Sequence, residues 1–196
     1  SGGVGVIGKA NSLICAPMLP LEPPDTHYLN AATGWLMLGD IAEAREEFNQ
    51  IRLAMRIHPQ VLDCEWRLLA REERWLAAAE VGERLVQSSP NDVNAWVHRS
   101  FALHELRRTR EAFELLLPAA GRFPTETLIP YNLACYTCQL GDLAAAQRWL
   151  EQSLALSQNV HQKLARLQSA LEDVDLEPLW PELRERIGTL RNEIEA

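Results

Sequence analysis

Four alanines recur along this chain at one fixed interval. Ala44, Ala78, Ala112 and Ala146 are each separated from the next by 34 residues. A similar frame surrounds each alanine, in the stretches LGDIAEA, EERWLAAA, LRRTREA and LGDLAAA. Self-similarity at a fixed interval of roughly 20 to 50 residues is typical of proteins that stack one small unit many times. The interval therefore predicts an elongated array of stacked units.

Each unit has the pattern of two helices that are joined by a tight turn. In the third unit, apolar residues from Trp96 to Leu116 recur at mixed spacings, which favours a helical stripe over the alternation of a strand. The turn lies five residues before each alanine, at Gly39, Glu73, Arg107 and Gly141. A glycine there allows the left-handed conformation that ends a first helix, and Asp40 and Asp142 can then cap the second helix. The alanine has to be small because the paired helices approach closely at that point.

A 34-residue helix–turn–helix unit with these alanines, and with Pro90 and Pro124 where second helices should stop, resembles the tetratricopeptide repeat. The resemblance covers residues 25–158 and implies four repeats, at 25–58, 59–92, 93–126 and 127–158. Two stretches, WVHRSFALHELRRTREAFELLLP and IPYNLACYTCQLGDLAAAQRWL, look like a largely uncharacterised bacterial branch of that superfamily. The resemblance implies an all-α fold, a right-handed superhelical array of repeats that C-terminal helices cap.

Several positions depart from the family pattern. The second unit carries Glu65 where an apolar residue is usual and Trp66 where a small one is usual, which suggests a tilted hairpin. Pro118 falls inside the expected second helix of the third unit, where it should kink or end that helix. Gln158 stands where a proline is expected in the fourth unit, so we expect the chain to run on as a helix.

Residues 159–196 continue past the repeats and are expected to cap the array. Two helices fit there, at about 160–172 and 180–194, separated by the stretch DVDLEP. An apolar stripe that can cover the last repeat is formed by Val160, Leu164, Leu167 and Leu171. Solenoids need such caps because the terminal hairpin otherwise exposes its apolar face.

Residues 1–24 contain no repeat and are expected to form an extended, flexible segment that could partly derive from an expression tag. GVGVIGK has the letters of a phosphate-binding loop, but Ala10 replaces the Ser or Thr that holds magnesium, and a proline-rich stretch follows instead of a helix. The apolar stretch SLICAPMLPL could pack into a groove of its own chain or of a neighbour, which would make a homodimer. The alternative is a mobile tail.

Charge and cysteine usage limit the class of partner. The net charge of −8 argues against binding to nucleic acid or to an anionic membrane, both of which require basic surface. No apolar run approaches the length of a membrane span. The four cysteines, at positions 15, 64, 135 and 138, show no pattern of a small disulfide-rich secreted domain, so a cytoplasmic location is expected.

By resemblance, the first helices of the repeats line a concave surface that often binds an extended or helical peptide. We expect peptide contacts from Asn30, Cys64, Arg67, Arg71, His98, Phe101, His104, Tyr131, Asn132 and Cys135. The same positions include Leu29, Thr33, Met37, Asp63, Asn94, Val97, Glu105, Cys138 and Gln139. Asparagine and histidine can hydrogen-bond a peptide backbone, aromatic rings can supply apolar contact, and the arginines can meet an acidic group. Alternatively, the asparagines only bridge helices, and the arginines pair with Asp63 or Glu105.

One specific family activity is not expected. Chaperone-binding members hold a terminal carboxylate with a clamp of lysine, asparagine and arginine. The matching positions here are Leu29, Thr33, Cys64, Asn94 and His98. The cationic members of the clamp are absent, so the resemblance does not extend to that activity.

Cys135 and Cys138 form a Cys-x-x-Cys pair that could suggest redox or metal chemistry. Redox pairs normally begin a helix, where the thiol pKa is lowered, whereas this pair falls in the middle of an expected helix. Zinc usually takes four ligands, and no second Cys-x-x-Cys exists, although His104 and His98 on the neighbouring first helix could join a partial cluster. We expect two small groove residues, with no metal and no cofactor.

No local signature of nucleophilic catalysis is found, so an enzyme is not expected. The leading hypothesis is a protein–protein interaction scaffold or adaptor that binds a peptide or partner helix in its concave groove. One alternative is a structural module that associates with itself through its N-terminal segment or terminal helices. Another is a positioning domain within a larger protein.

Overall fold

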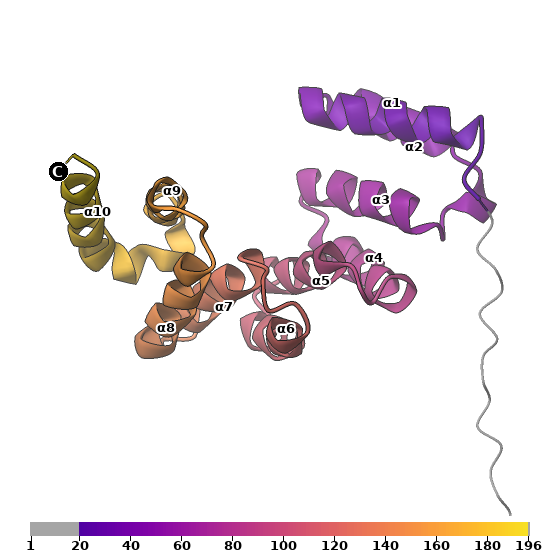
Figure 1. Ribbon diagram of the computed structural model, residues 1–196. Coiled ribbons are helices and arrows are strands. Elements are labelled where there is room, and N and C mark those ends of the chain that lie inside the picture. The colour runs from indigo at the N-terminus through magenta and orange to yellow at the C-terminus, as the bar shows by residue number, and fades with distance from the viewer. Residues whose placement is uncertain (1–19, 196) are drawn as a thin grey trace, which may run out of the picture.

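The computed structural model describes residues 20–195, and these residues form a chain of helices that curves into an arch (Figure 1). Within this range there are ten α-helices and two short 3-10 helices, and no strand. The helices are α1 (Asp25–Leu38), α2 (Ile41–Gln50), η1 (Leu53–Met55), α3 (Pro59–Arg71), α4 (Trp75–Ser88), α5 (Val93–Glu105), α6 (Thr109–Arg122), α7 (Leu128–Gln139), α8 (Leu143–Ala155), α9 (Val160–Ala170), η2 (Val174–Leu179) and α10 (Trp180–Glu195). The all-α prediction is confirmed, while the expectations for residues 1–19 lie outside the described residues.

Consecutive helices pack as antiparallel hairpins. In Figure 1, α3, α5 and α7 follow the inner side of the arch, and α4, α6 and α8 lie on its outer side. The alanines that mark the repeat are all fully buried. Within the described residues, no helix is long and apolar enough to cross a membrane.

All four hairpin turns use the left-handed backbone region, which the sequence predicts for the two glycine turns. Gly39 and Gly141 both have φ of 83°. Glu73 and Arg107 occupy the same turn position with φ of 55° and 62°. Residues with a side chain lose roughly 1–2 kcal/mol in this conformation relative to the right-handed one. The turn geometry therefore belongs to the fold itself, because it is retained where no glycine is present.

The two glycine turns are followed by capping aspartates. The side chain of Asp40 accepts a hydrogen bond from the backbone N–H of Glu43, and that of Asp142 accepts one from Ala145. These caps confirm the prediction from LGD, and each satisfies a backbone N–H that lacks a partner within its helix. Arg74 and Arg108 hold the cap position in the other two hairpins and make no such bond.

The hairpin α3–α4 differs from the others in the size of one buried residue. Gly82 stands where Phe48, Leu116 and Leu150 stand at the 34-residue interval. A Cβ atom added to Gly82 would lie 2.8 Å from the Cα of Arg99, so α4 and α5 approach each other closely there. The chain can make this approach only because the residue has no side chain.

The expected consequence of Pro118 is wrong in part, because α6 continues through it to Arg122. Pro118 and Glu114, whose carbonyl would normally receive the missing N–H, are both exposed to solvent. Leu116 and Ala119 are fully buried on the opposite side and keep the helix in place. The packed face thus outweighs one lost hydrogen bond on the solvent face.

The prediction that a helix runs on through Gln158 is also wrong. Helix α8 ends at Ala155, and the extended Asn159 begins the next helix as its cap, accepting a hydrogen bond of 2.9 Å from the N–H of Gln162. The side chain of Gln162 in turn accepts a hydrogen bond from the N–H of Gln158. These two bonds satisfy backbone N–H groups at Gln162 and Gln158 and favour the start of a new helix at this point.

The hairpin α1–α2 is anchored to the segment that follows it by a buried carboxylate. Asp25 is fully buried and accepts hydrogen bonds from the backbone N–H of Arg52 at 2.9 Å and from its Nε at 2.7 Å. The hydrogen bond from Arg52 lowers the pKa of Asp25 against the opposing effect of burial. This pair ties the beginning of α1 to the segment around η1.

Candidate functional site

The predicted groove residues lie on α1, α3, α5 and α7, the first helices of the hairpins. They do not form one uniform surface. The residues of α1, α3 and the start of α5 border two cavities, whereas several residues of α5 and α7 contact the chain's own η2. The inner side of the arch therefore has an open part and an occupied part.

The first cavity of the open part has a volume of about 360 Å³ and is called the polar cavity. Its walls come from Leu29, Asn30, Thr33, Pro59, Gln60, Asp63, Cys64, Arg67, Asp92 and Asn94. Among the predicted contacts, Asn30, Cys64 and Arg67 are thus brought together from two repeats. Asn30 and Asn94 are exposed on opposite sides of this cavity, one on α1 and one on α5.

The second cavity has a volume of about 250 Å³ and is called the arginine cavity. It is lined by Thr33, Leu36, Met37, Trp66, Arg67, Ala70 and Arg71. The two cavities share Thr33 and Arg67, so they adjoin along the boundary between α1 and α3. The arginine cavity combines apolar walls with two guanidinium groups, and no carboxylate is among its lining residues in the described chain.

An acidic side chain organises the border between α3 and α5. Asp63 accepts a bond of 2.8 Å from Nε of Arg67 and lies 3.0 Å from Nε2 of His98. Burial of Asp63 opposes its charge, but the hydrogen bond from His98 and the charge of Arg67 together lower its pKa. The structure thus shows for Arg67 the pairing with Asp63 that was the alternative to ligand binding.

Arg71 differs from Arg67 in having no ion pair. Among the described residues, no carboxylate lies within 4.0 Å of its guanidinium group. Its side chain is exposed, one helical turn beyond Arg67 on α3. A carboxylate from outside the chain could therefore pair with it without displacing an existing partner.

Trp66 forms the wall between the arginine cavity and α5. Its ring stacks on His98 with a centroid distance of 3.8 Å, and Phe101 meets it edge-on at 6.4 Å. The side chain of His98 is thereby held between Trp66 and Asp63. Within the described chain, the indole Nε1 of Trp66 is buried without a hydrogen-bond partner, and such a donor costs roughly 1–3 kcal/mol. Two of the predicted contacts, His98 and Phe101, thus also serve the packing between repeats.

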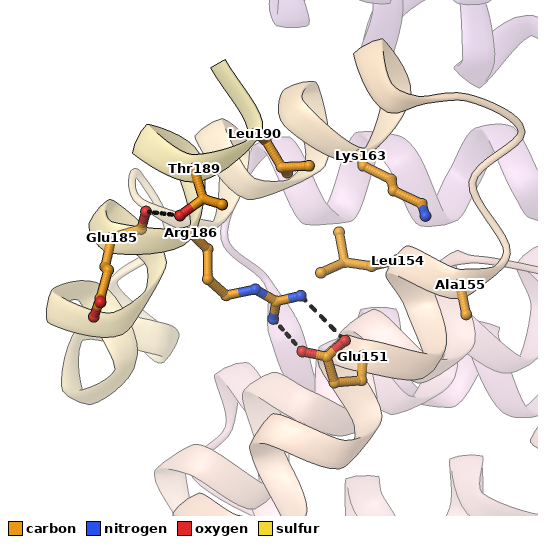
Figure 2. Close-up of a pocket in the computed structure, with 8 residues that line it drawn as sticks. All are labelled: Glu151, Leu154, Ala155, Lys163, Glu185, Arg186, Thr189 and Leu190. Carbon is orange, nitrogen blue, oxygen red and sulfur yellow. Dashed lines mark hydrogen bonds and ion pairs between the residues drawn. The ribbon is translucent and has the colours of Figure 1, made fainter. Parts of the chain in front are cut away.

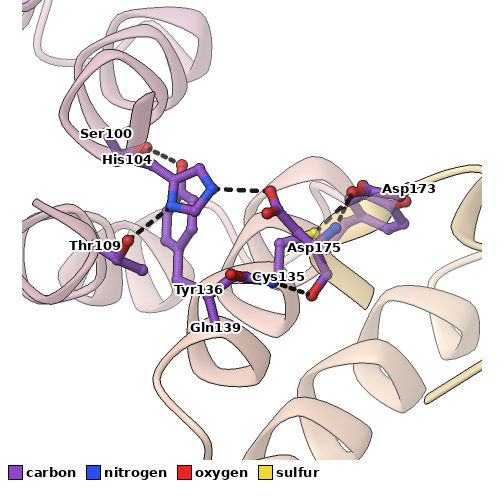
Figure 3. Close-up of polar contacts among 9 residues, drawn as sticks. Ser100, His104, Thr109, Cys135, Tyr136, Gln139, Asp173 and Asp175 are labelled. Carbon is purple, nitrogen blue, oxygen red and sulfur yellow. Dashed lines mark hydrogen bonds and ion pairs between the residues drawn. The ribbon is translucent and has the colours of Figure 1, made fainter. Parts of the chain in front are cut away.

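The occupied part is covered by the segment Asp173–Leu179, as Figure 3 shows for its polar contacts. Asp173 accepts hydrogen bonds from the hydroxyl of Tyr131 at 2.9 Å and from Sγ of Cys135 at 3.5 Å. Asp175 lies 2.8 Å from Nε2 of His104. Three predicted contacts therefore bind a segment of their own chain.

Further contacts continue along the same segment. The side-chain amide of Gln139 donates a hydrogen bond of 3.0 Å to the backbone carbonyl of Asp175. Nδ1 of His104 lies 3.0 Å from the hydroxyl of Thr109. Leu176 and Leu179 are buried at 0% and 3% exposure. The segment is thus held by both its carboxylates and its leucines.

The amide of Asn132 is directed at its own helix. Its Nδ2 donates a hydrogen bond of 2.8 Å to the carbonyl of Leu128, one turn earlier in α7. The described chain shows no bond from this side chain to another helix. Asn132 lies outside both cavities of the open part.

The cysteines of the Cys-x-x-Cys pair are buried, free thiols within α7. Burial, followed by the nearby charge of Asp173, raises the pKa of Cys135 well above its usual value, and burial also raises the pKa of Cys138. Burial raises the pKa of Cys64 to about 11. Since the thiolate is the reactive and metal-binding form, these environments oppose such chemistry. Over residues 20–192, no group of three His, Cys, Asp or Glu side chains could hold a metal ion.

A third cavity, of about 420 Å³, lies between α8, α9 and α10, at a place that the sequence did not predict (Figure 2). Arg186 of α10 forms an ion pair with Glu151 of α8 across it, with one N–O distance of 3.1 Å. Lys163 points toward the same space from α9. Arg186 lies beyond the four expected repeats, so the 34-residue interval could not have indicated this pair.

Sequence reasoning also missed Asp173 and Asp175, because DVDLEP was interpreted only as a break between helices. The alternation of acidic and apolar residues in this stretch is the one signal that could have indicated a bound segment. His104 and Asp175 are 71 residues apart, so the local periodicity of the sequence could not indicate their contact.

Solved structures with a similar fold come from several bacteria. MamA from Desulfovibrio magneticus RS-1, from residue 41 to its end, has a TM-score of 0.67 at 15% identity, covering 90% of this chain and 100% of that chain. TTC0263, a thermophilic TPR protein of Thermus thermophilus, has a TM-score of 0.60 at 20% identity, covering 85% and 98%. PilF of Pseudomonas aeruginosa has a TM-score of 0.60 at 20% identity, covering 83% and 76%.

By sequence, no family model matches this chain, and no curated protein matches it. The likeness to the solved structures concerns the fold, and it extends over most of the described chain. Together with the helix order and the left-handed hairpin turns, it confirms the predicted resemblance. The chain has the fold of a tetratricopeptide-repeat solenoid.

Proposed function

We propose that this chain is a non-catalytic protein–protein interaction module that binds a peptide or a partner helix across α1, α3 and the start of α5. One observation carries the proposal. The polar cavity and the arginine cavity adjoin on the inner side of the arch, and no described residue of the chain fills them. The fold supports a role in protein interaction in general, because its extended concave surface is suited to bind elongated partners.

The proposed contacts are a subset of those expected from the sequence. Asn30, Cys64, Arg67 and Arg71 border the two cavities. Asn30 can hydrogen-bond a peptide backbone, and Cys64 supplies a small, neutral wall. By contrast, His104, Tyr131 and Cys135 are engaged by η2 and the residue before it, so the proposal places the partner on the N-terminal half of the surface.

The compartment and the chemical requirements are part of the same proposal. A reducing, cytoplasmic location is supported by the three described cysteines, which are free thiols. The module requires no cofactor. The four repeats, the capping role of residues 159–196 and a bacterial origin also remain proposals.

The test is a selection of random peptides, each about 12 residues long, displayed on phage against the full chain. Peptides that bind are then synthesised with a fluorescent label and titrated against variants. Thr33→Trp fills the boundary of both cavities, and Asn30→Trp adds the same bulk at an exposed position on the polar cavity. Gln87→Trp, at an exposed position of the outer helix α4, is the matched control.

We expect both inner variants to lose binding by about tenfold or more, and Gln87→Trp to retain it. Thermal denaturation of each variant shows whether it remains folded. If the selected peptides bind the two inner variants as well as they bind the original chain, the cavities are not the binding surface and the proposal is wrong.

A further inference from the structure

The chain's own segment shows which kind of sequence the inner surface holds. Asp173 and Asp175 point toward polar groups of α5 and α7, as Figure 3 shows, while Leu176 and Leu179 are buried. Val174, between the two aspartates, remains 69% exposed. The segment thus binds through two acidic side chains followed by two buried leucines. We call the place on α5 and α7 that holds it the segment site.

The 34-residue interval relates the segment site to an equivalent place two intervals earlier in the chain. Two intervals before Cys135, which donates to Asp173, stands Arg67, and two intervals before Gln139 stands Arg71. Both arginines belong to α3, which follows the inner side of the arch as α7 does (Figure 1). The equivalent place on α3 therefore carries two arginines where the segment site carries neutral side chains.

An apolar surface adjoins these arginines. Leu36 and Met37, at the end of α1, line the same cavity as Arg71. Met37 is 84% exposed, although it borders the arginine cavity. An exposed methionine beside a leucine is an adaptable surface for an apolar side chain of a ligand.

The charges of the wall decide where an acidic group can be placed. Asp63 stands two intervals before Tyr131 and would repel a second carboxylate, but it is already paired with Arg67 and His98. Arg71 lies farther along α3 and has no carboxylate partner among the described residues. Complementary charge therefore exists at the Arg71 end of the cavity.

We propose that the arginine cavity binds an acidic–apolar segment of a partner protein, with a carboxylate at Arg71 and an apolar side chain against Leu36 and Met37. This inference rests on the proposed function and specifies its ligand. The partner segment has Asp or Glu within a few residues of Leu or another large apolar residue, as in the chain's own Asp173–Leu179.

The experiment uses the same display selection and reads the composition of the peptides that Thr33→Trp blocks. We expect them to be enriched in Asp or Glu close to large apolar residues. A synthetic peptide from this set should bind Arg71→Glu at least about tenfold more weakly than the original chain. Replacing its acidic residue by lysine should restore binding to Arg71→Glu. Arg110→Glu, on the outer helix α6, makes the same change of net charge and should leave binding unaltered.

The two proposals fail in different ways. If blocked peptides are neutral or basic, or if Arg71→Glu binds them unchanged, the acidic–apolar inference is wrong while the cavities remain the binding surface. If no selected peptide is blocked by Thr33→Trp, the proposed function itself fails. Equal weakening by Arg110→Glu would show long-range charge rather than a contact at Arg71, and would also overturn the inference.

Discussion

Replacing Gly82 by alanine has two opposite effects on the stability of the fold, one from helix propensity and one from the close packing of α4 against α5. In the interior of a helix, alanine is favoured over glycine by roughly 0.8–1 kcal/mol, so the change would normally stabilise α4. The added Cβ would lie 2.8 Å from the Cα, 2.9 Å from the Cβ and 3.0 Å from the N of Arg99. Two of these atoms are backbone, so no side-chain rotation can relieve the contact.

The helices must separate for the substitution to be accommodated. Bringing the shortest contact from 2.8 Å to the ordinary 3.4 Å requires α4 and α5 to move apart by several tenths of an ångström. Overpacking of this kind typically costs about 1–3 kcal/mol. After the gain in propensity, we expect a net loss of about 0–2 kcal/mol, which corresponds to a fall in Tm of up to roughly 8 °C for a chain of this size.

Gly34→Ala is the matched control, because a Cβ at that position of α1 would have no atom within 4 Å. It should raise Tm by roughly 2–4 °C. Thermal denaturation followed by circular dichroism measures both variants. An increase in Tm for Gly82→Ala equal to that for Gly34→Ala would refute the close approach of α4 and α5.

Three other predictions concern a turn, a buried carboxylate and the thiols. Arg107→Gly should stabilise the chain by about 0.5–1 kcal/mol in the same assay, because φ of 62° is unfavourable for arginine; an unchanged Tm would contradict this. Because the folded pKa of Asp25 is lowered by Arg52, its stabilising effect should be present above its unfolded pKa of about 4 and be lost as pH falls further. Urea denaturation between about pH 6 and pH 3 should therefore show a weaker pH dependence for Asp25→Asn, and equal dependence would rule out this role. Cys135 and Cys64 should react slowly with iodoacetamide until urea unfolds the chain, since burial raises both pKa values; mass spectrometry showing equal rates would contradict their burial.

The repeated part of the fold was predictable because its determinants are local. The left-handed turns at Gly39 and Gly141 and the caps at Asp40 and Asp142 follow from residues a few positions apart. The same geometry at Arg107 follows from its place in the interval rather than from its own preference. The local sequence pattern was thus sufficient to predict the hairpin turns and the helix caps that recur along the array.

Elsewhere, buried packing, a competing helix cap and contacts between distant segments outweighed the pattern on which the predictions rested. The continuation of α6 through Pro118 depends on the buried Leu116 and Ala119. The break after α8 depends on Asn159 capping a new helix. The binding of Asp173 to α7 depends on residues far away in the sequence, for which no periodicity exists.

The same limit applies to the candidate site. The interval placed Asn30, Cys64, Arg67 and Arg71 on first helices, and the structure brings them to two adjoining cavities. It could not indicate that η2 covers the C-terminal half of the surface, because η2 lies outside the repeats. Nor could it separate Arg67, which is paired with Asp63, from Arg71 one turn later, which has no ion-pair partner among the described residues.

We propose that the N-terminal half of the inner surface binds a partner while the chain's own segment occupies the other half. Hydrogen–deuterium exchange of the full chain, with and without a tightly binding selected peptide, tests this most directly. We expect slower exchange in α1 and α3, with no change in α7 or in Asp173–Leu179. Slower exchange in α7 together with faster exchange in Asp173–Leu179 would show that the peptide displaces the segment instead, and would contradict the claim.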